Sequence, residues 1–374
     1  MKFSGIVGSL LFILVLARIA NAATLYVSPN GKDSSTNPTN IETPFFSLQK
    51  AVDWSNPGDI IKLRGGTYKY TSGIWVGKSG TATLPIIIQS YDNEWAVLDG
   101  SQMRKTDIQL LGIGGSYIQV KWLEVTNSPS VGINLWNASN VTLFHVNINN
   151  SQRSGIYLGA DDFEPTSQRN FSNTIDGCTV WNNVKNNRGT TANAGWDSAI
   201  TLNTHKNIVI NCNVWGNWGE GIGAYGQHNY VGYNLVHDNF SVDIYVCQAV
   251  GNVIENNAII GEWLEPYYRN GRASAGIQMA NEGPVNVLNG NIIRNNRIKN
   301  VWRGLYFWAG GFAPTGLINM KIYGNTVEDC TDAIILIEKD YHAGSSVFNN
   351  IFTRNRSLII DMSNNVENYE NILK

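Results

Sequence analysis

Residues 199–232 read AITLNTHKNIVINCNVWGNWGEGIGAYGQHNYVG, and this stretch contains one short pattern twice. A small residue followed by isoleucine occurs at Ala199-Ile200 and, 22 residues later, at Gly221-Ile222. The pair recurs along the chain at spacings that return to 22 or 23 residues, at Gly132-Ile133, Gly155-Ile156, Gly276-Ile277, Gly304-Leu305 and Ala333-Ile334, with Asp243-Ile244 in its place once. A fixed period of this size predicts a solenoid, in which each repeat buries its apolar side chains only against its neighbours.

Many repeats also carry a strand pattern that begins with asparagine. Asn207, Asn229 and Asn252 start three such strands and lie 22 and 23 residues apart. Their amides are therefore expected to stack and to hydrogen-bond one another along a turn. At this period the coil region, residues 85–360, forms about a dozen coils.

The segment before the coils, residues 23–84, predicts an N-terminal cap. Thr24–Val27 and Ile60–Leu63 read as short strands, and the spacing of apolar residues in Pro44–Val52 predicts a short helix that Pro57-Gly58-Asp59 ends. Such a helix covers the apolar core and the unpaired strand edges at an open solenoid end. The sequence thus predicts one all-β solenoid domain over residues 23–374.

The bulk properties predict an exported, soluble and monomeric chain. Residues 1–22 read as a signal peptide with Lys2, an apolar run and the cleavage site Ala20-Asn21-Ala22, although an uncleaved anchor is the alternative. A net charge of −2 with only 15% charged residues favours neither nucleic acid nor an anionic membrane as partner. A secreted, extracellular or periplasmic protein with an uncharged or mildly acidic polymer as substrate fits this surface better.

Two of the four cysteines share the context Cys-x-Val-Trp. Cys178 and Cys212 are expected to stack on nearby coils, either as buried free thiols or as a disulfide bridge.

Three carboxylates recur with the repeat and form the main catalytic candidate. Asp197, Glu220 and Asp243 lie 23 residues apart, and adjacent coils are ~4.8 Å apart. Three acids that close together need a cation such as calcium, a shared proton or a substrate dipole. If the isoleucines point inward, strand alternation turns Asp197 and Asp243 outward and leaves Glu220 nearer the core or in a turn. The alternative is that these carboxylates only cap turns.

Basic and aromatic residues supply further candidates for catalysis and sugar binding. Lys206 and His228 each follow the isoleucine of their coil by six residues, and either could remove a proton beside a uronate carboxylate. Arg272 and Arg303 could pair with that carboxylate. Five aromatic residues could offer outward rings to sugar C–H groups, or could only stack between coils: Tyr157, Tyr225, Tyr245, Tyr306 and Trp308.

Two segments break the period and lengthen turns, residues 161–172 and 261–272. Insertions of this kind gather on the binding face of solenoids. The first holds Asp161, Asp162 and Glu164, which form either a calcium-binding loop or a solvated turn.

The cap motifs resemble those of secreted right-handed parallel β-helix proteins of the pectate-lyase-like superfamily, including the family 9 polysaccharide lyases. The resemblance rests on Leu25-Tyr26-Val27-Ser28, Thr43-Pro44-Phe45, Pro57-Gly58-Asp59, Gly65-Gly66-Thr67-Tyr68 and Leu98-Asp99-Gly100. It implies a right-handed parallel β-helix, calcium held mainly by aspartates, and a lysine base. By position, Asp197 and Asp243 would match part of the acid cluster and Lys206 the base. The paired aspartates of the family pattern do not occur in the central coils of this chain.

Together these features predict a secreted carbohydrate-active enzyme that cleaves a uronate-containing polysaccharide by β-elimination. Two alternatives stay open. A glycoside hydrolase would use Asp197, Glu220 and Asp243 as acid and base, and a non-catalytic protein would only bind polysaccharide through its aromatic residues.

Overall fold

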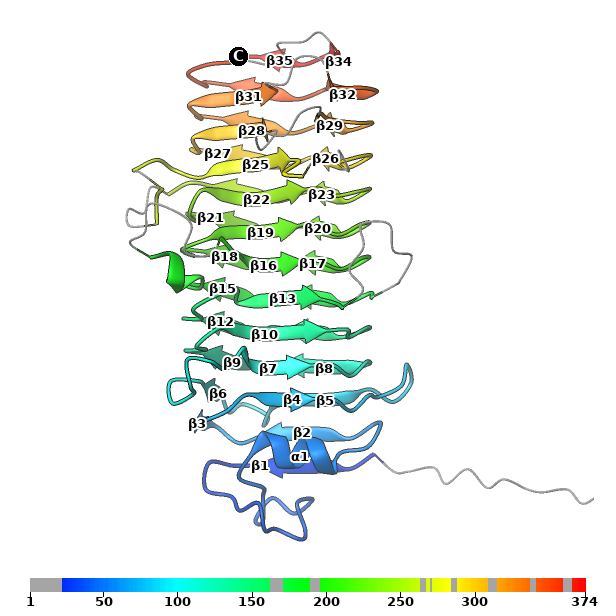
Figure 1. The fold of residues 1–374 in the computed structure, drawn as a ribbon, viewed down its shortest axis with the longest axis vertical. Coiled ribbons are helices and arrows are strands. Elements are labelled where there is room, and N and C mark those ends of the chain that lie inside the picture. Colours follow the sequence, from blue (N-terminus) through cyan, green and yellow to red (C-terminus); the bar gives the residue numbers. More distant parts are fainter. Residues whose placement is uncertain are drawn as a thin grey trace, which may run out of the picture.

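The computed structural model describes residues 22–161, 171–188, 196–262, 267–269, 271–283, 288–308, 315–336, 341–358 and 365–374. Within them the strands form three parallel sheets that run the length of one tube, with each coil contributing one strand to each sheet through most of its length (Figure 1). The predicted solenoid is confirmed as a parallel β-helix.

The first sheet, sheet A, has 13 strands. They are β1 (Thr24–Val27), β2 (Ile60–Leu63), β5 (Ile86–Ser90), β8 (Ile118–Lys121), β11 (Thr142–Phe144), β14 (Thr174–Asp176), β17 (Ile208–Ile210), β20 (Tyr230–Gly232), β23 (Val253–Glu255), β26 (Ile292–Arg294), β29 (Lys321–Tyr323), β32 (Ser345–Phe348) and β34 (Val366–Tyr369).

The second sheet, sheet B, has 12 strands. They are β3 (Gly66–Lys69), β6 (Ala96–Asp99), β9 (Leu123–Thr126), β12 (Asn147–Asn149), β15 (Thr179–Trp181), β18 (Asn213–Trp215), β21 (Leu235–His237), β24 (Ala258–Ile260), β27 (Arg297–Lys299), β30 (Thr326–Glu328), β33 (Ile351–Thr353) and β35 (Ile372–Leu373).

The third sheet, sheet C, has 10 strands and faces the viewer in Figure 1. They are β4 (Ile74–Val76), β7 (Gln109–Ile113), β10 (Val131–Trp136), β13 (Ile156–Gly159), β16 (Ser198–Leu202), β19 (Glu220–Ala224), β22 (Val242–Cys247), β25 (Ala275–Ala280), β28 (Arg303–Trp308) and β31 (Asp332–Leu336).

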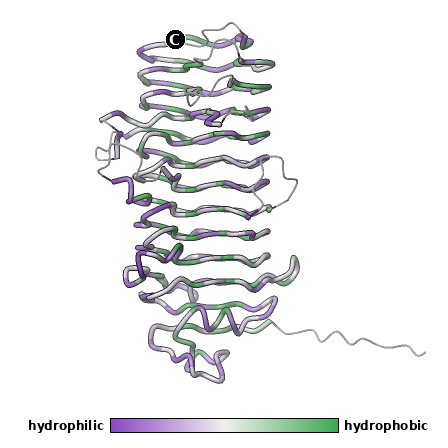
Figure 2. Tube along the Cα trace, viewed as in Figure 1, coloured by the Kyte–Doolittle hydropathy of each residue, from purple (hydrophilic) through white to green (hydrophobic). Residues whose placement is uncertain are grey.

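The aliphatic member of the repeated pair sets the register of sheet C. Ile156 pairs with Ile200, Ile200 with Ile222, and Ile222 with Ile244, and all are fully buried. Hydrophobic stretches therefore recur in every coil and stack along the axis (Figure 2). Side chains one repeat apart become lateral neighbours, and this arrangement builds the site described below.

Buried asparagines join successive coils at the turns. The amide of Asn207 donates to Asn229 Oδ1 at 3.0 Å, and the backbone N–H of Asn229 donates to Asn252 Oδ1 at 2.7 Å, so the predicted ladder is confirmed. A second ladder, between sheets B and C, runs from Asn217 to Asn239 at 2.8 Å. These bonds satisfy backbone and side-chain groups that would otherwise be buried without partners.

The predicted N-terminal helix is α1 (Leu48–Trp54), whose N-cap Ser47 accepts from the N–H of Lys50. It packs on β1, β2 and β4 at the end of the tube (Figure 1). The strands of the cap already belong to the three sheets, which continue to β35, so the division at residues 84 and 360 stays a prediction. A 3₁₀ helix, η1 (Lys185–Asn187), precedes β16.

All four cysteines are buried and free, which favours the thiol alternative for Cys178 and Cys212. Among the described residues, no helix is long and apolar enough to cross a membrane. Residues 1–21 of the predicted signal peptide, and Asp162 and Glu164 of the acidic insertion, lie outside the described residues.

Candidate active site on sheet C

A cleft of about 690 Å³ lies over the outer face of sheet C. Its lining residues come from six successive strands, β13 to β28, and from the adjoining turns. The lining includes eight of the predicted residues: Tyr157, Asp197, Glu220, Tyr225, Tyr245, Arg303, Tyr306 and Trp308. Asp243, Lys206, His228 and Arg272 do not belong to it.

Glu220 is the best-placed ionisable group in the cleft. Its Oε2 accepts hydrogen bonds from the hydroxyls of Ser198 and Tyr225, both at 2.8 Å, and those two hydroxyls lie 3.1 Å apart. Oε1 accepts no hydrogen bond from the described residues, so it is available to a ligand. Glu220 was expected nearer the core or in a turn, and that expectation is wrong, because Ser198 and Glu220 are register partners whose side chains both face the cleft.

Burial raises the pKa of the Glu220 carboxyl to about 7, and the nearby charges of Glu282 and Asp197 act in the same direction. The hydrogen bonds from Tyr225 and Ser198 oppose this rise because they stabilise the carboxylate. A carboxyl group with this pKa is partly ionised near pH 7, as an acid–base catalyst requires.

Gly223 makes room for this network. Tyr225, two residues further along the chain, folds back over the strand. A Cβ at position 223 would lie 2.2 Å from Ser198 Oγ and 2.4 Å from the Tyr225 ring. Both contacts are too short for any side chain. Gly223 is therefore required by the site as well as by the strand.

Asp197 is paired with an arginine that the sequence reading missed. Arg153 donates from Nε to Oδ2 at 2.7 Å and from Nη2 to Oδ1 at 2.8 Å, and both residues line the cleft. Arg153 precedes Ile156 by three residues, as Asp197 precedes Ile200, and these isoleucines are register partners. Comparing the repeats position by position could have found this pair.

Asp243 lies inside the tube and not on its outer face, so its predicted outward orientation is wrong. It occupies the small-residue position before the inward isoleucine, where Gly221 stands one coil earlier. Its Oδ1 accepts from the Asn239 amide at 2.9 Å and its Oδ2 from the Ser274 hydroxyl at 2.5 Å. Asp243 thus continues the second asparagine ladder, and burial raises its pKa to about 6.

Lys206 and His228 lie at the turn from sheet C to sheet A, where both are exposed and have positive φ angles of 58° and 53°. Each directly precedes an asparagine of the first ladder. Arg272 lies behind the cleft wall, with its guanidinium 4.9 Å from the centre of the Trp302 ring. The structure therefore does not bring these three residues to Glu220.

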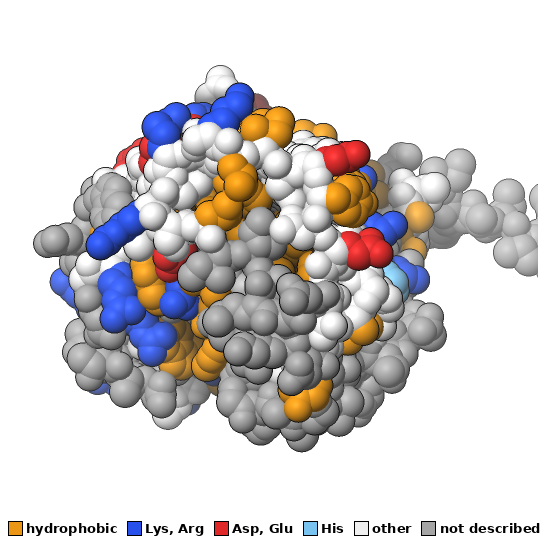
Figure 3. Space-filling model, turned by 90° about the horizontal axis from the view of Figure 1, so that it is seen from above, with side chains coloured by type: hydrophobic (Ala, Val, Ile, Leu, Met, Phe, Trp, Pro, Cys, Tyr) orange, Lys and Arg blue, Asp and Glu red, His pale blue; other side chains and the backbone are white. Residues whose placement is uncertain are grey.

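Arg303 presents a guanidinium to the cleft between two aromatic rings, at 4.0 Å from the centre of the Trp302 ring and 4.2 Å from that of Tyr306. Its Nε lies 3.5 Å from Asp332 Oδ2, and the group makes no hydrogen bond within the described part of the chain. Arg269, over Trp196 at 4.6 Å, is a further lining residue. Seen from above the tube, Lys and Arg side chains gather beside hydrophobic ones on the left of the view (Figure 3).

Tyr245 is nearly buried and lines the cleft beside Glu220. It pairs in register with Gly223, so its ring occupies the space next to the Glu220 network. Its hydroxyl has no partner in hydrogen-bonding geometry among the described residues. Burial and the nearby carboxylates of Glu220 and Glu282 raise its pKa, so the hydroxyl stays protonated.

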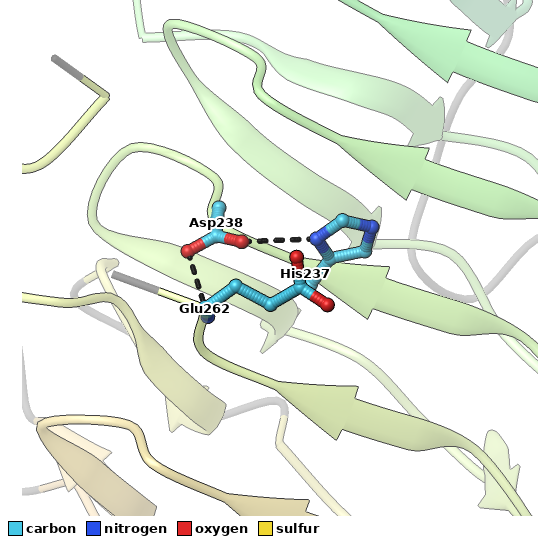
Figure 4. A group of neighbouring side chains, drawn as sticks. All are labelled: His237, Asp238 and Glu262. Carbon is cyan, nitrogen blue, oxygen red and sulfur yellow. Dashed lines mark hydrogen bonds and ion pairs between the residues drawn. The ribbon is translucent and has the colours of Figure 1, made fainter. Parts of the chain in front are cut away.

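The three predicted carboxylates do not fit a calcium ion. Calcium takes six to eight oxygen ligands. Both oxygens of Asp197 accept hydrogen bonds from the Arg153 guanidinium, and Asp243 points into the interior. In the described ranges, one group of three possible ligands lies within 4.8 Å: His237, Asp238 and Glu262 (Figure 4). It lies outside the cleft lining, and Asp238 there accepts from the Glu262 N–H and pairs with His237 Nδ1.

Several lining residues had no place in the predicted site, namely Arg153, Trp196, Ser198, Thr201, Asn203, Ser241, Val242, Arg269, Gln278, Glu282 and Trp302. Ser198 had a sequence signal, because it precedes its isoleucine by two residues, as Glu220 does. Arg269 and Glu282 come from irregular segments that have no counterpart in neighbouring coils, so the period could not predict them.

The family model for the Pel9A-like right-handed β-helix region matches residues 25–301. The chain belongs to this family. The match confirms both the predicted resemblance and the right-handed fold, and it includes β16, β19 and β22 of the cleft.

Relatives and solved structures agree with this assignment. The pectate lyase PEL9 of Emericella nidulans is 30% identical over 200 residues, which cover 44% of this chain and 48% of that enzyme. The chain thus spans about half the length of the curated relatives it matches. The crystal structure of pectate lyase Pel9A aligns over 95% of this chain and 80% of its own, with a TM-score of 0.56 and 18% identity. The lacto-N-biosidase of Eubacterium ramulus has the same fold, with a TM-score of 0.57, 14% identity and coverage of 94% and 68%.

Proposed function

We propose that the protein is a polysaccharide lyase that cleaves a uronate-containing glycan by β-elimination in the sheet C cleft. The observation that carries this proposal is a buried carboxyl group, Glu220, held through Oε2 by the Ser198 and Tyr225 hydroxyls in the same cleft as the Arg303 guanidinium and the Tyr245 hydroxyl. The pectate lyases among its relatives support the reaction type. The predicted signal peptide supports export to the medium or periplasm, where such polymers occur.

The reaction requires three groups, and the cleft offers a candidate for each. A cation beside the uronate carboxylate lowers the cost of the negative charge that develops when the C5 proton leaves. Glu220 Oε1 takes that proton, the C4–O4 bond breaks, and a C4–C5 double bond forms. The Tyr245 hydroxyl gives its proton to the departing O4, and solvent restores both groups afterwards.

The proton-accepting role falls to Glu220 because it lines the cleft and has a pKa near 7. Lys206 and His228 were the sequence candidates for this role, but neither reaches the cleft. Ser198 and Tyr225 hold the Glu220 carboxylate in one orientation through Oε2, which leaves Oε1 free to accept the proton.

A glycoside hydrolase is the second candidate, favoured by one observation. Asp197 and Glu220 line the same cleft, and the Asp197 charge contributes to the raised pKa of Glu220. A neutral carboxyl group beside an ionised one is the arrangement that hydrolases use as acid and base.

One screen separates these functions. The protein is incubated with pectate, alginate and neutral glycans, and both ultraviolet absorbance and reducing ends are followed. We expect absorbance from an unsaturated product on a uronate polymer, and its loss in Glu220→Gln. Glu367→Gln is the matched control, because Glu367 is exposed on β34, far from the cleft. Reducing ends without absorbance would identify a hydrolase, and binding without product would identify a binding protein.

A further inference from the structure

Binding of a uronate polymer is favoured by positive charge beside its carboxylates, and the residues of this cleft point to the source of that charge. A metal ion would need several unoccupied oxygen ligands around one point. Asp197 does not provide them, because Arg153 both occupies its two oxygens and places a positive charge where a cation would have to sit. Asp243 is buried inside the tube, where Asn239 and Ser274 donate hydrogen bonds to its two oxygens.

Glu220 and Glu282, the other two carboxylates of the cleft, do not complete this ligand set, because among the described residues they form with Asp197 no group of three possible ligands within 4.8 Å. Glu220 Oε2 is engaged by two hydroxyl donors, and burial already favours the neutral form of Glu220. A buried carboxyl group that holds its proton up to about pH 7 provides a weak ligand for a hard cation, which binds the ionised form.

Arg303 has the properties that a carboxylate receptor needs. The rings of Trp302 and Tyr306 hold its guanidinium, at 4.0 and 4.2 Å from their centres, and so reduce the entropy lost when a ligand binds. The 3.5 Å contact with Asp332 positions Nε without forming a hydrogen bond. Nε is buried and forms this ion pair, so the Nη1 and Nη2 donors are the ones available to a ligand. Together they match a carboxylate in bidentate geometry.

We propose that Arg303 binds a carboxylate of the substrate, in a subsite three coils from Glu220, so that the protein binds acidic glycans without a divalent cation. This inference rests on the proposed function and specifies how its substrate is recognised. Arg303 lies one coil from Gln278, two coils from Tyr245 and three coils from Glu220. The last separation is ~14 Å along the axis, so Arg303 holds a sugar other than the one that loses its C5 proton.

Calorimetric titration with uronate oligosaccharides tests the inference. The Glu220→Gln protein, which is not expected to turn over, is titrated once with a chelator and once with added calcium. We expect equal dissociation constants within about twofold. Arg303→Gln in the same background should weaken binding at least about thirtyfold. Arg303→Lys should weaken it less, because the ammonium group keeps the positive charge but cannot form the two parallel hydrogen bonds of a guanidinium.

The control is Arg104→Gln, which changes an exposed arginine paired with Asp107 outside the cleft and should leave binding unchanged. Circular dichroism shows whether each variant is folded. Binding only in calcium, or equal affinity of Arg303→Gln and its parent, would overturn the inference while the proposed function stands. Binding of no uronate oligosaccharide under either condition would overturn the proposed function, and this inference with it.

Discussion

At the scale of single residues, Glu220 determines the pH dependence of the reaction. Because burial raises its pKa to about 7 and the base must be ionised, we expect kcat/KM to rise as the pH rises through about 7. Glu220→Gln should lower kcat by roughly 10²- to 10⁴-fold and remove this rise. Steady-state rates between pH 5 and 9 check both effects, and an unchanged acid limb in the variant would exclude Glu220 as the base.

Asp243 has a different role, which a stability measurement reveals. Burial raises its folded-state pKa from 3.8 to about 6, so the proton is held more tightly in the folded protein than in the unfolded chain. Its contribution to stability is therefore full below pH 3.8 and is lost as the pH rises through about 6.

Asp243→Asn removes this titration and continues the ladder with an amide. We expect the variant to be more stable than the parent at pH 8, on the order of 1–3 kcal/mol, with the difference vanishing below about pH 4. Denaturant unfolding at both pH values measures it, and activity should persist. A folded but inactive Asp243→Asn variant would show that Asp243 takes part in catalysis.

At the scale of the element, strand β19 can carry the site because Gly223 leaves room for the Ser198 and Tyr225 side chains. Gly223→Ala would push a methyl group against Ser198 Oγ and the Tyr225 ring. We expect kcat to fall at least about tenfold and the free energy of unfolding to fall by about 1–3 kcal/mol. Losing the Tyr225 hydrogen bond should also move the acid limb of the rate profile to higher pH.

Tyr225→Phe separates the two effects, since it removes the hydroxyl without adding a methyl group at position 223. The acid limb should again move to higher pH, with a smaller loss of stability. Rates and pH profiles of Gly223→Ala that match those of the parent would mean that Tyr225 does not fold back over the strand.

The repeated strand also explains which parts of the site the sequence could predict. The period placed Tyr245, Tyr306 and Trp308 on one outer face, because residues at equivalent positions of neighbouring coils are lateral neighbours. It failed for Asp243, because the residue before the isoleucine points inward at the corner between sheets B and C. The other repeats have glycine or alanine at that position, and this was the sequence signal that the position points inward.

Residues outside the period could not be predicted. Arg272 lies in the irregular segment 261–272 and has no position in the period. Arg303, by contrast, precedes Leu305 by two residues, as Glu220 precedes Ile222, so the period could place it on the cleft face. The raised pKa of Glu220 arises from burial by side chains of several coils. The fold was predictable from its repeat, whereas the chemistry depends on contacts between coils.

At the scale of the whole molecule, the cleft extends along the tube over the six strands from β13 to β28. Five intervals of ~4.8 Å give a length of ~24 Å, which suits a short oligosaccharide better than a single sugar. We expect kcat/KM to rise at least about tenfold from a disaccharide to an oligomer that fills the cleft, because remote contacts contribute to transition-state binding. Rates on a size series of uronate oligomers check this, and equal rates for all lengths would limit the site to one or two sugars.

The location of the site on sheet C is the claim on which the other predictions depend. A crystal structure of the Glu220→Gln protein with a bound uronate oligosaccharide tests it most directly. We predict that the sugar chain runs along sheet C, with one carboxylate on the Arg303 guanidinium and the C5 hydrogen of another sugar of the chain facing position 220. An oligosaccharide bound along the turn that carries Lys206 and His228, with the cleft empty, would contradict the account.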